Sequence, residues 1–99
     1  QSSNKTTTVN IDKYTGKITT HDQDITANTE VNFTLTNSAI GADDVVVVGH
    51  RSGGNLGDYL IQAHTMGSGS CEISIRNLTN GTLGQALVIN FVVIKGSDS

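Results

Sequence analysis

Two short runs of the chain, Val45–Val48 and Leu87–Ile94, are almost entirely apolar. Elsewhere apolar and polar residues alternate, as in strands with one face toward the core and one toward water. Because neighbouring side chains of a strand point to opposite faces, both faces of these two strands need a cover. A domain of 99 residues has room for about two layers. We therefore expect a second copy of the chain to cover the outer face of these strands.

Composition and patterning predict an all-β fold. Val and Ile account for 18 residues and Thr for 13, and all three types suit strands. No window places apolar residues at helical spacing. Alternating segments predict strands near residues 5–11, 16–20, 29–36, 44–51, 57–65, 69–76 and 86–95. Their number and spacing predict one antiparallel β-sandwich or jelly roll over residues 1–99, with loose ends at residues 1–4 and 96–99.

The alternation also assigns each strand a face. The side chains expected in the core are Val31, Phe33, Leu35, Cys71, Ile73, Ile75, Leu87, Ile89, Phe91 and Val93. The side chains expected at an interface between copies are Val46, Val48, Val88, Val92 and Ile94. Glycine-rich connections at residues 52–57, 67–70 and 80–84 suit hairpin turns, and we expect them to be displayed at one end of the domain.

Charge and composition exclude several classes of partner. The net charge of −3 and the scattered Lys and Arg residues argue against binding to nucleic acid. There is no 18-residue apolar run, so we expect no membrane insertion. The single Cys71 cannot form an internal disulfide and is expected to be a small core residue. The first residue is Gln rather than Met, which favours a piece of a longer protein.

The chain has no complete catalytic motif, so we expect no enzyme. Gly16-Lys17 matches part of a phosphate-binding loop, but Ile11 stands where that loop needs glycine and Ile18 where it needs Ser or Thr. The Gly16-Lys17 segment is predicted to be a turn. No nucleophile, carboxylate pair or set of metal ligands has the required spacing.

His50 and His64 are candidate ligands under one condition. Two histidines of one chain do not complete a metal site. If three copies surround a threefold axis, however, one histidine becomes three imidazoles, which could hold a metal ion when neutral or an anion when protonated. The plain alternative is that both histidines are exposed or hydrogen-bonded. No other cofactor is expected.

Residues 37–95 resemble the C-terminal β-sandwich domain of bacteriophage tail fibres and tailspikes. The resemblance rests on the valine run, on the segment Ile73-Ser74-Ile75-Arg76-Asn77, and on Leu87–Ile94 close to the end of the chain. It implies a homotrimeric virion component at the tip of a fibre or spike, which serves trimerisation and host attachment through a cell-surface glycan or protein. It implies no particular ligand-binding residues.

Two rival functions stay open. A carbohydrate-binding module normally stacks sugars on exposed aromatic rings, whereas this chain has no Trp and only Tyr14 and Tyr59. A capsid decoration protein would also form a trimer. The sequence does not separate trimerisation from receptor binding.

Overall fold

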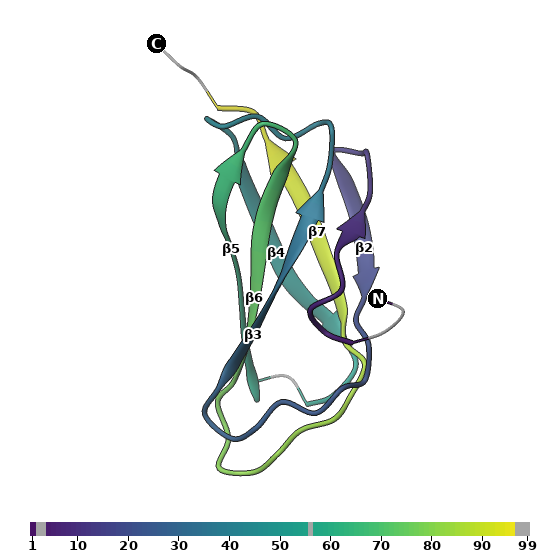
Figure 1. Cartoon of the computed structure of the whole chain (residues 1–99), viewed down its shortest axis with the longest axis vertical. Coiled ribbons are helices and arrows are strands. Elements are labelled where there is room, and N and C mark those ends of the chain that lie inside the picture. The colour runs from purple at the N-terminus through teal and green to yellow at the C-terminus, as the bar shows by residue number, and fades with distance from the viewer. Residues whose placement is uncertain (2–3, 56, 97–99) are drawn as a thin grey trace.

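The computed structural model of the chain describes residue 1, residues 4–55 and residues 57–96 (Figure 1). These residues form strands and no helix, which confirms the predicted all-β fold. The strands are β1 (Val9–Asn10), β2 (Thr15–Thr19), β3 (Glu30–Thr36), β4 (Val45–Ser52), β5 (Tyr59–Gly67), β6 (Ser70–Asn77) and β7 (Val88–Ile94).

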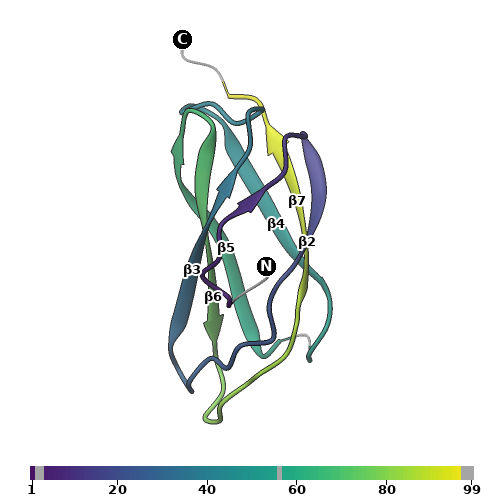
Figure 2. The ribbon, with the colours of Figure 1, turned by 45° about the vertical axis from the view of Figure 1, so that its right-hand side comes forward.

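The strands form two sheets in a sandwich-like arrangement (Figure 2). The four-stranded sheet has the order β1-β3-β6-β5, and the three-stranded sheet has the order β2-β7-β4. All neighbours are antiparallel except β1 and β3, which are parallel. The prediction of a wholly antiparallel fold is therefore wrong at β1. The reason is that the chain crosses to the other sheet after β1 instead of turning back within the same sheet.

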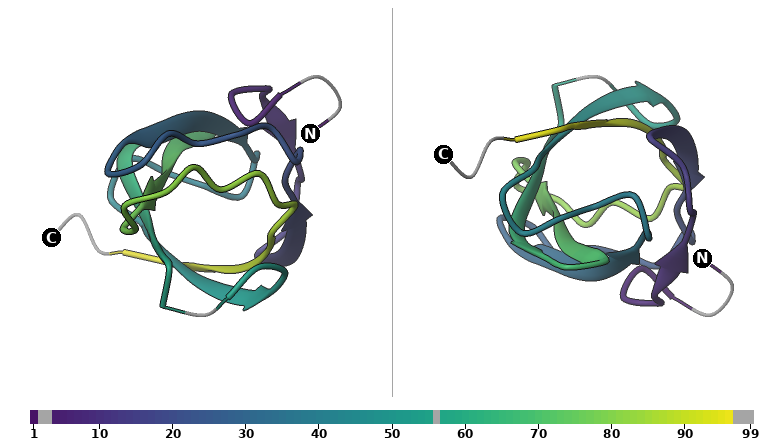
Figure 3. Two further views of the ribbon diagram at one scale, coloured as in Figure 1. Left: turned by 90° about the horizontal axis from the view of Figure 1, so that it is seen from below. Right: turned by 90° about the horizontal axis from the view of Figure 1, so that it is seen from above.

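The core lies between the two sheets, which surround a common interior when viewed along the long axis (Figure 3). Nine of the ten predicted core residues are buried, and the tenth, Val31, is partly buried against them. Fully burying a Val, Leu, Ile or Phe side chain stabilises a fold by about 1.5–3 kcal/mol. The alternation of apolar and polar residues therefore predicted the core correctly in β3, β6 and β7.

The N-terminal segment differs most from the prediction. The strand expected over residues 5–11 is limited to β1, because Thr7 N–H bonds to Asn4 O in a turn and Lys5 N–H bonds to the Gln23 side chain. Gln1 donates to Lys5 O at 2.6 Å, and Gly96 N–H donates to Asp44 at 2.9 Å. Each described end therefore has a hydrogen-bond partner in the fold, while residues 2–3 and 97–99 lie outside the described residues, so the predicted looseness of the ends stays a prediction.

Gly16 and Lys17 lie inside β2 rather than in the predicted turn. Gly16 is the cross-strand partner of Phe91. A Cβ atom at Gly16 would lie 2.8 Å from the Phe91 ring, so the ring occupies the space of the missing side chain. This close packing accounts for glycine at that position.

The glycine-rich connections do not lie at one end, as the sequence had predicted. The connections after β4 and after β6 lie at the lower end in Figure 1, whereas the β5–β6 hairpin around residues 67–70 lies at the upper end. The difference follows from the strand order, since β5 and β6 run in opposite directions and their hairpin must lie at the far end. Residue 56 of the first connection lies outside the described residues.

Candidate functional site

The outer face of the three-stranded sheet carries exposed apolar side chains in two neighbouring rows. Val45 pairs with Ile94, and Val47 pairs with Val92, across the β4–β7 ladder. Their exposed fractions are 54% for Val45, 47% for Val47, 36% for Val92 and 50% for Ile94. We call these four residues the apolar face. Exposed apolar residues gathered in this way usually mark an interaction surface.

The predicted interface residues are divided between the two sides of this sheet. Val92 and Ile94 are exposed and Val88 is half-buried, on the outer side that the sequence predicted. Val46 and Val48, however, turn toward the core, because their partners in β7 are the buried residues Val93 and Phe91. Placing Val46 and Val48 at an interface was therefore wrong. Val45 and Val47 occupy the outer positions of β4 instead.

The outer face of the four-stranded sheet is mostly polar, with Leu60 of β5 as an exposed apolar side chain beside Arg76. Its central hydrogen-bond network joins three strands: Asn32 of β3 accepts from Ser74 Oγ of β6, which is bonded to His64 Nε2 of β5 at 2.6 Å. Beside it Thr34 Oγ1 donates to Glu72 at 3.0 Å. These polar side chains satisfy one another, so they need no partner molecule.

The two candidate histidines lie on different parts of the molecule. His50 turns inward from β4, where its Nε2 is 2.6 Å from Gly53 O and its ring packs edge-on against Tyr59 with the ring centres 5.6 Å apart. His64 is exposed on the polar face, where its Nδ1 is 2.8 Å from Thr65 Oγ1. A single chain therefore does not bring His50 and His64 together. Both rings already have hydrogen-bond partners.

A buried amide and a backbone bridge between Ile25 and Leu83 hold the lower end of the domain together. Asn77 is fully buried, and its Nδ2 donates to Ile25 O at 2.9 Å and to Gly81 O at 2.8 Å. Its Oδ1 accepts from Thr79 N at 2.8 Å and from Thr79 Oγ1 at 2.7 Å. These bonds join the loop before β3 to the loop after β6. The lower loops therefore form one connected surface.

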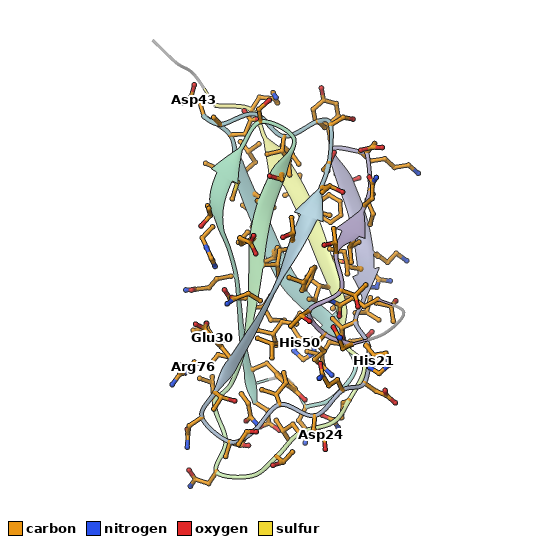
Figure 4. The ribbon with its side chains drawn as sticks, in the orientation of Figure 1. His21, Asp24, Glu30, Asp43, His50 and Arg76 are labelled. Carbon is orange, nitrogen blue, oxygen red and sulfur yellow. The ribbon has the colours of Figure 1, made fainter. Side chains whose placement is uncertain are left out.

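The upper end is held by a buried carboxylate. Asp44 Oδ2 accepts from Lys95 Nζ at 2.6 Å and from Gly41 N at 2.7 Å, and Oδ1 accepts from Gly96 N. The bond from Lys95, followed by those from Gly96 and Gly41, lowers the pKa of Asp44 from 3.8 to about 2. Figure 4 shows the neighbouring Asp43 at this upper end and Asp24 at the lower end. The aspartates at these two ends therefore cannot share a metal ion within one chain.

Two further buried groups are titratable. Burial, with a smaller contribution from Glu72, raises the pKa of the Cys71 thiol from 9.0 to about 11. Cys71 is therefore a neutral core residue, as the sequence predicted. Lys5 is also fully buried, and its Nζ donates to Gln23 O at 2.5 Å. Desolvation lowers the pKa of Lys5, while the nearby Asp22 and Asp24 oppose that shift. The sequence provided no signal for a buried lysine in a polar segment.

The arrangement offers little to a bound small molecule or metal ion. The described residues enclose no pocket and bring no three His, Cys, Asp or Glu side chains together around a metal position. They also include no helix long and apolar enough to cross a membrane. Two hydroxyls contact the His64 imidazole on the outer face, from Ser74 and from Thr65, but Ser74 is buried and donates to Asn32.

Comparison of the chain with protein-family models, with curated proteins and with solved structures found no match. The apolar face is therefore the principal candidate for a functional surface, on its chemistry alone.

Proposed function

We propose that the chain is a structural module that associates with copies of itself through the apolar face. The observation that carries this proposal is the contrast between the two outer faces. One exposes four neighbouring apolar residues, Val45, Val47, Val92 and Ile94, whereas the other exposes a hydrogen-bonded polar network and the single apolar residue Leu60. The cross-strand pairs Val45–Ile94 and Val47–Val92 stabilise the sheet of a single chain, but the part of these side chains that stays exposed gains only when a partner covers it.

The size of the effect can be worked out from the exposed fractions. Burying a whole Val or Ile side chain contributes about 1.5–3 kcal/mol. The four side chains of the apolar face are 36–54% exposed. Covering the remaining exposed part therefore contributes roughly 1 kcal/mol for each residue, or roughly 4 kcal/mol for each chain. Covering the apolar face therefore supplies part of the free energy that a subunit contact needs, since association itself costs at least about 4 kcal/mol.

The resemblance of residues 37–95 to phage fibre and spike domains completes the proposal. In it, the assembly is a homotrimer of β-sandwiches at the tip of a virion tail fibre or tailspike. The connected lower loops are the surface offered to a host glycan or protein, since recognition is usually carried by loops on a rigid scaffold. A jelly-roll topology stays a prediction of the sequence.

The rival functions receive less support. Sugar stacking would need an exposed aromatic ring, but Tyr59 is buried, which leaves Tyr14 as the exposed Tyr among the described residues. A capsid decoration protein would use the same kind of self-association, so the apolar face does not distinguish it from a fibre domain. The two differ in the length of the native chain. We propose no enzymatic role, because the Ser74–His64 pair lies on a flat sheet face without a pocket among the described residues.

The experiment compares two neighbouring residues of β7 that point to opposite sides. We expect Val92→Asp to leave the chain folded but to dissociate the assembly, because the carboxylate would be buried in the contact without a partner. Val93 is 5% exposed in the core, so Val93→Asp is expected to unfold the chain. Circular dichroism measures folding and light scattering measures mass.

A substitution on the polar face serves as the control. Gln62→Asp adds the same charge at an exposed position of the four-stranded sheet and is expected to preserve the mass of the wild type. If Val92→Asp also preserved that mass while remaining folded, the proposed interface would be wrong.

A further inference from the structure

Gly49 lies inside β4 at a place where the fold of one chain does not require glycine. Its φ is outside the left-handed region, and a Cβ atom built on it would meet nothing within 4 Å. Glycine inside a strand costs stability relative to alanine, since its backbone loses more freedom on folding. A residue that weakens its own strand without a local reason points to the close approach of something outside that strand.

The other strand glycines have local explanations. Gly16 makes room for the Phe91 ring, and Gly67 ends β5 at the hairpin. The loop glycines Gly53 and Gly69 adopt left-handed φ values of 83° and 86°. None of these three explanations applies to Gly49. This residue lies next to the apolar face, on the same side of the sheet.

The row that contains Gly49 also offers hydrogen bonds. Gly49 pairs with Asn90 of β7, and Asn90 pairs with Lys17 of β2. The Asn90 side chain is half-exposed and makes no hydrogen bond with the described residues. It is the one polar residue among the outer positions of β7, which are otherwise Val88, Val92 and Ile94. The Asn90 amide can exchange hydrogen bonds with the main chain of an approaching segment, and Gly49 leaves room beside it for that main chain.

We propose that the main chain of a second copy makes its closest approach to this domain over Gly49, beside the Asn90 amide. The inference rests on the proposed self-association and adds the place and the orientation of the contact. The valine and isoleucine side chains of the apolar face contribute the apolar part of the contact, and the Gly49–Asn90 row contributes its polar part.

The charges on the outer side of the three-stranded sheet favour a second copy that binds there through a different surface of its own. The outer side of the three-stranded sheet carries Lys17 and, at the β4 bulge, the exposed Arg51, whereas it carries no acidic residue. A symmetric contact of this side with itself would oppose like charges. Asp12, Asp22, Asp24 and Glu30 are exposed outside the three strands of this sheet, and Asp43 lies two residues before Val45. A head-to-tail contact can set such carboxylates against Lys17 and Arg51, and contacts of this kind form a ring such as a trimer when the rotation between neighbours closes.

The test introduces a side chain at Gly49. Gly49→Val places a β-branched residue in open space of a single chain, so the unfolding midpoint of the dissociated chain is expected to stay the same or rise. In the assembly the same side chain fills the position of the partner's backbone, and we expect association to weaken at least about tenfold. Gly49→Ala is expected to have the same two effects, each smaller. Gln62→Val adds a valine at an exposed position of the four-stranded sheet and serves as the matched control.

Sedimentation at several concentrations separates this inference from the proposal on which it rests. A wild-type assembly that Gly49→Val weakens, while Gln62→Val leaves it unchanged, supports the close approach at Gly49. If the wild type associates and Gly49→Val associates equally well, the place of contact is wrong but the self-association stands. A wild type that remains monomeric at its highest soluble concentration overturns both.

Discussion

Replacing Asn77 by alanine tests whether one buried side chain holds the lower loops together. The amide makes four hydrogen bonds to Ile25, Thr79 and Gly81 while fully buried. Alanine would leave two carbonyl oxygens, one N–H and one hydroxyl without this partner. The backbone bridge between Ile25 and Leu83 would still join the two loops, so the substitution would weaken their connection rather than remove it.

The magnitude follows from the surroundings of each bond. A neutral hydrogen bond contributes about 1 kcal/mol net, so four bonds amount to about 4 kcal/mol. Gly81 is exposed and Thr79 half-exposed, so water can replace part of what these two residues lose, whereas Ile25 is buried. We therefore expect Asn77→Ala to lower the free energy of unfolding by about 2–3 kcal/mol. Small domains have about 5–15 kcal/mol in total.

Urea denaturation at a fixed chain concentration measures this effect, since self-association would otherwise shift the midpoint. Asn80→Ala is the matched control, because Asn80 is exposed and its one bond, from Asn28 Nδ2, is 3.4 Å long. We expect the control to change stability by less than about 0.5 kcal/mol. Equal effects of the two substitutions would refute the assignment of Asn77 as a side chain that stabilises the connection between the loops.

Three further predictions concern titratable residues. Asp44→Asn should lower the melting temperature at neutral pH; since the folded pKa is depressed to about 2, the difference from wild type should persist above pH 3.8 and shrink as the pH falls toward 2. The melting temperature should not respond to a chelator, because His50 and His64 already have hydrogen-bond partners. If a chelator lowered the melting temperature, and His50→Gln or His64→Gln abolished that fall, an axial metal would be indicated instead. Cys71 should react with a thiol reagent at the rate of unfolding, since it is buried with its pKa raised to about 11; fast labelling of the folded chain would contradict its burial.

The sequence predicted the faces of some strands and not others for a physical reason. In β7 the inward residues could be recognised because Asn90 breaks the apolar run and marks the outer side. In β4 four successive valines look the same on both faces, so the sequence contains no information about which of them turns inward. The register with β7 decides this, because Val46 and Val48 stand opposite Val93 and Phe91.

The polar anchors could not be predicted from the sequence. Asn77 and Asp44 lie in segments that read as ordinary strand ends and turns. Their roles depend on partners far along the chain, as in the bond from Lys95 to Asp44 across 51 positions. The parallel pairing of β1 was equally invisible, since two residues carry no pattern.

The mass of the wild-type chain in solution tests the central claim most directly. Light scattering during size-exclusion chromatography gives that mass without reference to shape. Self-association through the apolar face predicts a trimer with three times the 10.4 kDa of one chain. A stable, well-behaved species of 10.4 kDa at all accessible concentrations would contradict it.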